Sequence, residues 1–139
     1  GQLLIKGKNR RGTMKAGIKK HIRQLLWDYQ HIEKKLQEYE DVMLMNRNPF
    51  LEYPVEQPTE KITISQIEFH KLFLQTVEDI LADSTRDVQD IFLVKYKNGY
   101  PYKKNEFVAC ETFLSESTIA RRDTEFIHEI AYRLGWYEI

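Results

Sequence analysis

Six side chains that can make specific hydrogen bonds lie within eight consecutive positions near the end of the sequence. They comprise three hydroxyls, one carboxylate and two guanidinium groups: Ser115, Glu116, Ser117, Thr118, Arg121 and Arg122. Arg can pair bidentately with guanine, and Glu can accept a hydrogen bond from cytosine. At the start of a helix, these groups would have the chemistry needed to read base edges in the major groove of DNA.

Two short helices joined by a tight turn would position these side chains. The spacing predicts a first helix at about 104–111, in which Ala109 is the small residue that lets a second helix cross closely. Ser115 is placed to cap the second helix, and Ile119 faces back into the pair. The pattern predicts a helix-turn-helix at about 104–134 that leaves five side chains for base edges: Glu116, Ser117, Thr118, Arg121 and Arg122.

Contacts with phosphate are expected from the segment that precedes this motif. Phosphate contacts supply affinity, whereas base contacts supply specificity. Over residues 95–122 basic residues outnumber acidic ones six to three, which favours a local attraction to phosphate. Arg122 is expected to contact either a base or a phosphate. The residues expected to contact phosphate are Lys97, Tyr102, Lys103 and Lys104.

The motif resembles region 4 of sigma-70-type factors and related phage regulators. The similarity lies in Val108-Ala109, followed by the run Ser-Glu-Ser-Thr-Ile-Ala-Arg-Arg at 115–122, and in the lead-in segments 86–92 and 96–100. The sequence departs from that pattern at the turn. Phe113 stands where such turns usually have Gly, and Thr112 replaces a large aliphatic residue.

The whole layout resembles the late transcriptional regulators of phages of Gram-positive bacteria, of the RinA/ArpU type. That resemblance implies a sequence-specific activator of late packaging and structural genes. The implied partners are double-stranded promoter DNA and host RNA polymerase, in the cytoplasm of the bacterial host at the nucleoid. Two alternatives stay open: a small terminase subunit that binds packaging-site DNA, and a protein-interaction module that does not bind DNA.

The first half of the chain predicts a basic arm followed by a long helix. Residues 1–27 carry eight basic residues and no acid, and residues 1–17 are expected to form a flexible arm. Apolar residues then repeat as a heptad seam, which predicts one helix over 18–46, roughly 40 Å long. The seam can serve self-association, giving a homo-oligomer, or it can pack on later helices of the same chain. Its members are Ile18, Ile22, Leu25, Tyr29, Ile32, Leu36, Tyr39 and Met43.

The remaining segments complete an all-α organisation. A Pro-rich linker is expected over 47–62, followed by a helical DNA-binding domain over 63–139. Ser65 and Glu68 have the spacing of a capping box. A further helix is expected after the break at 83–85, ending at a turn over 98–101.

Other chemistry is not expected from this sequence. The net charge of zero is the balance of +8 over residues 1–27 and −8 over the rest. The four His residues lack metal-ligand spacing, so no metal, no cofactor and no enzymatic activity are expected. Cys110 is expected to be a buried structural thiol in a reducing compartment. No apolar run is long enough for a membrane span, and no signal peptide is expected.

Overall fold

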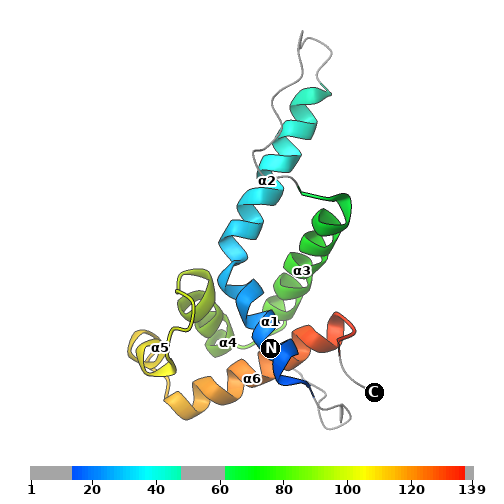
Figure 1. Cartoon of the computed structure of the whole chain (residues 1–139). Helices are drawn as coiled ribbons and strands as arrows, with labels where there is room; N and C mark the ends of the chain where they lie inside the picture. Colours follow the sequence, from blue (N-terminus) through cyan, green and yellow to red (C-terminus); the bar gives the residue numbers. More distant parts are fainter. Residues whose placement is uncertain (1–13, 48–61, 137–139) are drawn as a thin grey trace.

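Helices make up all the regular secondary structure in residues 14–47 and 62–136, the part of the chain that this computed structural model describes. The predicted all-α class is therefore confirmed. Figure 1 shows α2 and α3 side by side as a pair that projects away from α4, α5 and α6. The elements are α1 (Ala16–Trp27), α2 (Tyr29–Asn46), α3 (Ile64–Ala82), α4 (Arg86–Ile91), the π-helix η2 (Phe92–Lys97), α5 (Asn105–Thr112) and α6 (Glu116–Arg133).

The long N-terminal helix is broken at Asp28, so the prediction of one helix over 18–46 is wrong. Asp28 ends α1 with φ −91° and ψ 4°, and α2 starts at the next residue. The break allows the residues on either side to face the interior. Trp27 donates its indole N–H to the Lys95 carbonyl at 2.9 Å. Tyr29 is buried, and its ring centre lies 5.0 Å from that of Phe92, with the two rings nearly perpendicular. Helix α1 also begins inside the arm predicted over 1–17.

Helix α3 runs back along α2 and covers part of the heptad seam. Its capping box is formed by Thr63 and Gln66, two residues before the predicted pair of Ser65 and Glu68. Ile32 and Leu36 of α2 are buried against Ile67 of α3. The seam is therefore used for packing inside the chain over this stretch.

Helix α4 widens into the π-helix η2 instead of ending as a regular α-helix. The N–H of Asn98 donates to the Leu93 carbonyl five residues earlier, at 2.8 Å. Carbonyls in this segment accept hydrogen bonds from side chains elsewhere in the chain. Lys103 Nζ donates to Val94 O at 3.1 Å, and Gln30 Nε2 donates to Lys97 O at 2.7 Å.

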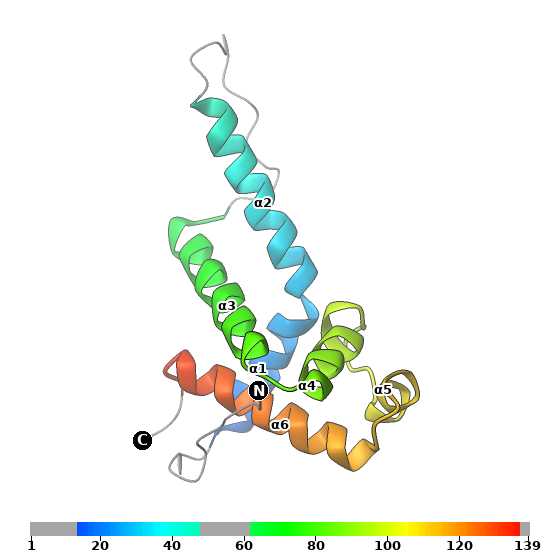
Figure 2. The same cartoon turned by 180° about the vertical axis from the view of Figure 1, so that it is seen from behind.

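One core joins the N-terminal helices to the C-terminal ones. Helix α6 crosses the lower ends of α1 and α3, as the two opposite views show (Figures 1 and 2). The predicted linker over 47–62, which lies mostly outside the described residues, therefore does not divide the fold into a separate helix and domain. The buried core comprises Met14, Ile22, Leu26, Tyr29, Phe73, Val77, Ile80, Val88, Phe92, Tyr96, Phe126, Ile127, Ile130 and Ala131.

Candidate nucleic-acid interface

Helices α5 and α6 are joined by the three residues 113–115, which places the start of α6 at one extremity of the molecule (Figure 1). The Ser115 hydroxyl accepts a hydrogen bond from the Thr118 N–H at 3.1 Å, so the predicted N-cap is confirmed. Val108 and Ile119 are both buried in a cluster that α5 and α6 share with Ile91. Apolar contacts therefore fix the angle at which α6 leaves the turn.

Phe113 closes α5 in a left-handed conformation, with φ 62° and ψ 19°. Its N–H donates to the Ala109 carbonyl at 2.9 Å, which satisfies one of the last free acceptors of α5. Such a conformation costs a residue with a Cβ about 1–2 kcal/mol, which is why Gly is the usual choice. The turn therefore keeps the geometry expected of Gly although the residue is Phe.

The first turns of α6 present part of the predicted base-reading set to solvent. Glu116, Ser117 and Arg121 are exposed, and neither charged group makes an ion pair with any residue in the described ranges. Thr118 is half-buried, and its hydroxyl accepts from Ser115 at 2.8 Å. Three of the five predicted side chains are therefore exposed at one end of the helix, and Thr118 supports the cap.

Arg122 lies against α4 rather than on the free face of α6. Its Nε lies 3.2 Å from Asp87, and its NH1 nitrogen lies 3.1 Å from Glu125. Burial acts to raise the pKa of Asp87, but hydrogen bonds from Thr85 and the Val88 N–H, together with Arg122, lower it overall. Arg122 is thus engaged in the fold, and its assignment to bases or phosphate does not match its position.

The four residues predicted to contact phosphate have different surroundings. Lys103 is buried, and its Nζ lies 2.6 Å from Glu111. Lys97 Nζ lies 3.6 Å from Glu33 on α2, away from α6. The Tyr102 ring is exposed and lies 5.4 Å from Trp27. Among the three lysines, only Lys104, at the N-cap of α5, is exposed and without an ion pair to a described residue.

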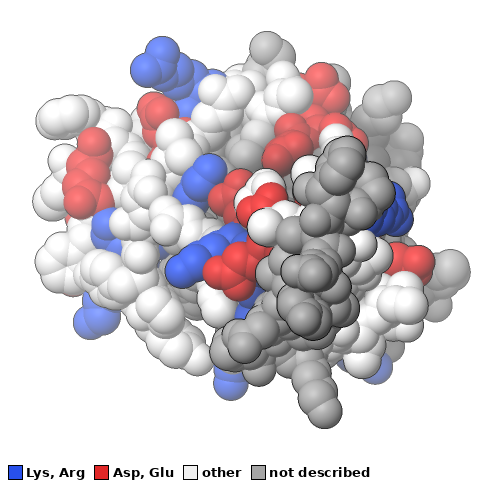
Figure 3. Space-filling view, turned by 90° about the horizontal axis from the view of Figure 1, so that it is seen from above, with Lys and Arg blue, Asp and Glu red and all other residues white. Residues whose placement is uncertain are grey.

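The local excess of basic residues is therefore cancelled within the fold. Of the six basic residues in 95–122, four are ion-paired to carboxylates of the same chain. Two remain free among the described residues, Lys104 and Arg121. The four ion pairs weaken the non-specific attraction of this part of the chain to phosphate. On the face turned away from α6, which Figure 3 shows, basic and acidic side chains are also interspersed.

A buried polar cluster, which the sequence did not predict, lies on the inward side of α6. Asp123 is buried, and its Oδ2 accepts from Arg23 of α1 and from Lys95 of η2, each at 3.1 Å. Its Oδ1 accepts from the Tyr96 hydroxyl at 2.5 Å, and Lys95 also donates to Asn105 at 2.8 Å. One carboxylate thus ties α6 to both α1 and η2.

The electrostatics of the cluster favour the neutral phenol of Tyr96 and the charged guanidinium of Arg23. Burial is the largest cause that raises the pKa of Tyr96 well above its ordinary value, and the Asp123 charge adds to it. Burial acts to lower the pKa of Arg23, but the charge of Asp123, the interaction with Tyr96 and the hydrogen bonds to both together more than offset it, so the pKa is raised. The signal in the sequence was that Asp123 follows Ile119 by four residues, which places both on the inward side of the helix.

Cys110 is exposed, so the prediction of a buried thiol is wrong. The inward face of α5 is made by Val108, with Ala109 and Thr112 half-buried beside it. Cys110 lies on the opposite face of this short helix because two residues turn a helix through about 200°.

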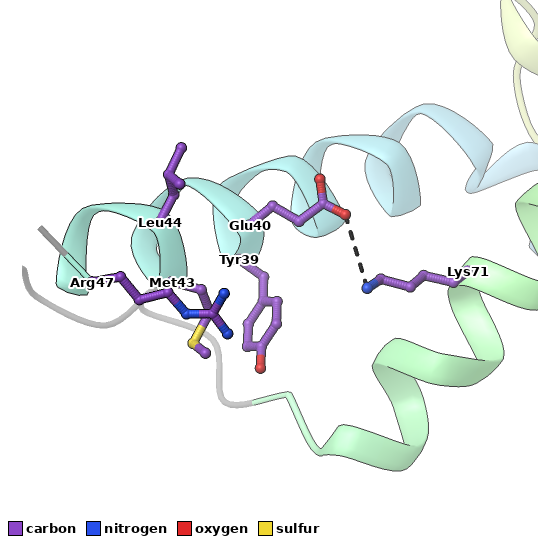
Figure 4. A pocket seen from close by; sticks show the side chains of 6 residues that line it. All are labelled: Tyr39, Glu40, Met43, Leu44, Arg47 and Lys71. Atoms are coloured by element: carbon purple, nitrogen blue, oxygen red, sulfur yellow. Dashed lines mark ion pairs between the residues drawn. The ribbon is translucent and has the colours of Figure 1, made fainter.

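A pocket lies far from α6, between α2 and α3. It encloses about 370 Å³ and is lined by Tyr39, Glu40, Met43, Leu44, Arg47 and Lys71. Figure 4 shows Glu40 and Lys71 reaching toward each other across it, with 3.9 Å between their charged atoms. Within the described ranges, no group of three or more His, Cys, Asp or Glu side chains is arranged to hold a metal ion. No described helix combines the length and apolar character needed to cross a membrane.

Comparison with known proteins gave no match to a family model, to a curated protein or to a solved structure.

Proposed function

We propose that this chain binds double-stranded DNA in a sequence-specific manner and acts as a transcriptional regulator. The observation that carries the proposal is the α5–turn–α6 arrangement, with Ser117 and Arg121 exposed at the capped start of α6. Arg121 supplies a bidentate donor for guanine, and Glu116 an acceptor for cytosine. The resulting helix-turn-helix would place the start of α6 in the major groove.

Affinity for phosphate would come chiefly from the N-terminal basic segment. Lys20 is exposed on α1, which packs across α6, and Lys104 is exposed at the start of α5. Lys6, Lys8, Arg10 and Arg11 add four positive charges but lie outside the described residues. Removing the first 13 residues should therefore reduce the salt dependence of binding, because fewer counterions would be released.

The resemblance to phage late regulators supports an activator of packaging and structural genes that cooperates with host RNA polymerase. The proposal is made for a single protomer. The first part of the seam expected to support a homo-oligomer, including Ile22, Ile32 and Leu36, is buried within the chain. An oligomer would therefore have to use the later part of the seam, where Met43 is exposed, or another surface.

Binding to labelled promoter fragments at several salt concentrations, with competitor DNA, tests the proposal. Retention of one fragment against competitor supports it, whereas equal affinity for all fragments, or none, refutes it. Arg121→Ala should weaken binding by about 1–3 kcal/mol and relax the preference at one base pair. Arg86→Ala is the matched control, because Arg86 is an exposed guanidinium on α4 with only a 3.9 Å ion pair.

A protein-interaction module without DNA binding is the second candidate, and the pairing of the basic residues favours it. Lys95, Lys97 and Lys103 have carboxylate partners in the chain and are not available to phosphate. Under this alternative, the chain would select no promoter fragment, and Arg121→Ala would leave its behaviour toward DNA unchanged. The promoter experiment thus separates the two candidates directly.

A further inference from the structure

Phe113 combines a strained backbone with a side chain that the chain does not cover. Its exposed fraction is 93%, the highest among the exposed large apolar side chains of the described residues. Its φ of 62° is one of two positive values found at non-glycine residues in the described ranges. A Phe at this position therefore gains no burial in exchange for the strain.

Tyr102, the other non-glycine residue with positive φ, makes a ring contact within the chain that can offset its backbone strain. Its φ is 65°, and its ring lies 5.4 Å from the ring of Trp27. Among the described aromatic residues, Phe113 has no such ring partner. The contrast indicates that no described residue of the chain is the partner of Phe113.

The position of Phe113 limits what that partner can be. Phe113 stands two residues before the N-cap of α6, and the exposed Ser115, Glu116 and Ser117 follow it. A duplex that receives the start of α6 would lie beside the Phe113 ring. Among the groups that base pairs present in the major groove, the C5-methyl of thymine is the apolar one, and Phe is among the side chains that contact it.

We propose that Phe113 is a specificity-determining residue that contacts the methyl group of a thymine at the edge of the site read by α6. This inference rests on the proposed function. It adds an apolar contact from the turn to the polar contacts from the helix. It also explains why a Phe with a left-handed backbone stands where Gly would fit without strain.

The test uses the full chain and a duplex selected by it from a random library. Wild type should prefer thymine at one edge position. Deoxyuridine lacks only the C5-methyl group, so replacing that thymine by deoxyuridine should weaken binding about fourfold, the change in binding constant expected from the burial of one methyl group. Phe113→Gly should melt at a higher temperature because the strain is relieved, yet bind the thymine duplex at least fourfold more weakly. It should not distinguish thymine from deoxyuridine. Leu72→Ala is the control, because Leu72 is a 54% exposed apolar residue on α3.

The outcomes separate this inference from the proposed function. If wild type selects a duplex but Phe113→Gly binds it equally well, or still distinguishes thymine from deoxyuridine, the thymine contact is refuted while DNA binding stands. If Phe113→Gly weakens both duplexes and wild type also treats them alike, Phe113 does not read a methyl group. If wild type selects no duplex, the proposed function fails and this inference fails with it.

Discussion

The ammonium of Lys95 lies 3.1 Å from the carboxylate of Asp123, and both side chains are buried. Removing one partner of a buried charge pair is costly when the other partner has no further counterion. This applies to Lys95, whose described carboxylate partner is Asp123, whereas Asp123 also pairs with Arg23. Asp123 is on α6 and Lys95 on η2, so the orientation of α6 depends on this pair.

Asp123→Asn should reduce the free energy of unfolding by about 3–5 kcal/mol, because it leaves the Lys95 charge buried without a counterion. Urea unfolding monitored by circular dichroism measures this free energy. Asp90→Asn is the matched control: the Asp90 side chain is 41% exposed and pairs with Arg86 at 3.9 Å, so its loss should cost at most about 0.5 kcal/mol. The double variant Asp123→Asn, Lys95→Met should recover part of the loss; strict additivity would contradict the coupling.

Two glycines should respond in opposite directions to substitution by Ala. A Cβ at Gly99 would lie 2.0 Å from the Lys95 carbonyl oxygen, so Gly99→Ala should destabilise the fold by about 1–3 kcal/mol. A Cβ at Gly17 would meet nothing within 4 Å, and Gly17 lies inside α1. Gly17→Ala should therefore stabilise by up to about 1 kcal/mol. Thermal unfolding of both variants checks the signs, and a stable Gly99→Ala protein would show that the turn is wider than described.

Substitution of Ser115 and of Ser117 should have different effects, the first on stability and the second on DNA binding. Ser115→Ala removes the cap of α6 and should cost about 1 kcal/mol of stability. The Ser117 hydroxyl is exposed, and its one described hydrogen bond is to Ser115 at 3.2 Å, so Ser117→Ala should leave the melting temperature nearly unchanged. Under the proposed function, Ser117→Ala should instead weaken binding to the specific duplex. Equal melting temperatures for both variants would mean that the cap contributes nothing.

Stability should fall on mild acidification because of two histidines. Burial is the main cause that lowers the pKa of His70 and His128 below 6.5, and Lys35 and Lys19 respectively add to it. The unfolded chain then takes up protons more readily, so stability is present above pH 6.5 and is lost as the pH falls toward the folded pKa. The urea midpoint should be lower at about pH 5.5 than at about pH 7.5.

His70→Gln should reduce that loss between the two pH values. His31→Gln removes an exposed imidazole from α2 and serves as the control for net charge. A pH response that is the same in His70→Gln as in wild type would assign the loss to other groups.

Local signals in the sequence predicted the elements around the turn. The Ser115 cap and the inward Ile119 depend on neighbours within four residues, so the sequence alone predicted both. The break at Asp28 depends on Trp27 and Tyr29 reaching η2, which is distant in sequence. A continuous heptad pattern therefore predicted a continuous helix.

The candidate site was harder to predict because its charges are paired across the fold. Lys95 and Lys103 counted as basic residues of the motif, yet each is buried against a carboxylate. Arg121 and Arg122 are neighbours in the sequence, and only the structure distinguishes them: Arg122 pairs with Asp87 of α4, whereas Arg121 is exposed. Counting charges along a chain therefore does not predict which ones reach the surface.

The wide turn of η2 has a consequence for how the helices are coupled. Three of its carbonyls, at Val94, Lys95 and Lys97, accept hydrogen bonds from side chains outside the segment. An isolated peptide of residues 86–99 lacks those donors and would relax toward an ordinary α-helix or a coil. The geometry of η2 is thus imposed by the assembled fold, and hydrogen exchange at its amides would report whether α1 is docked.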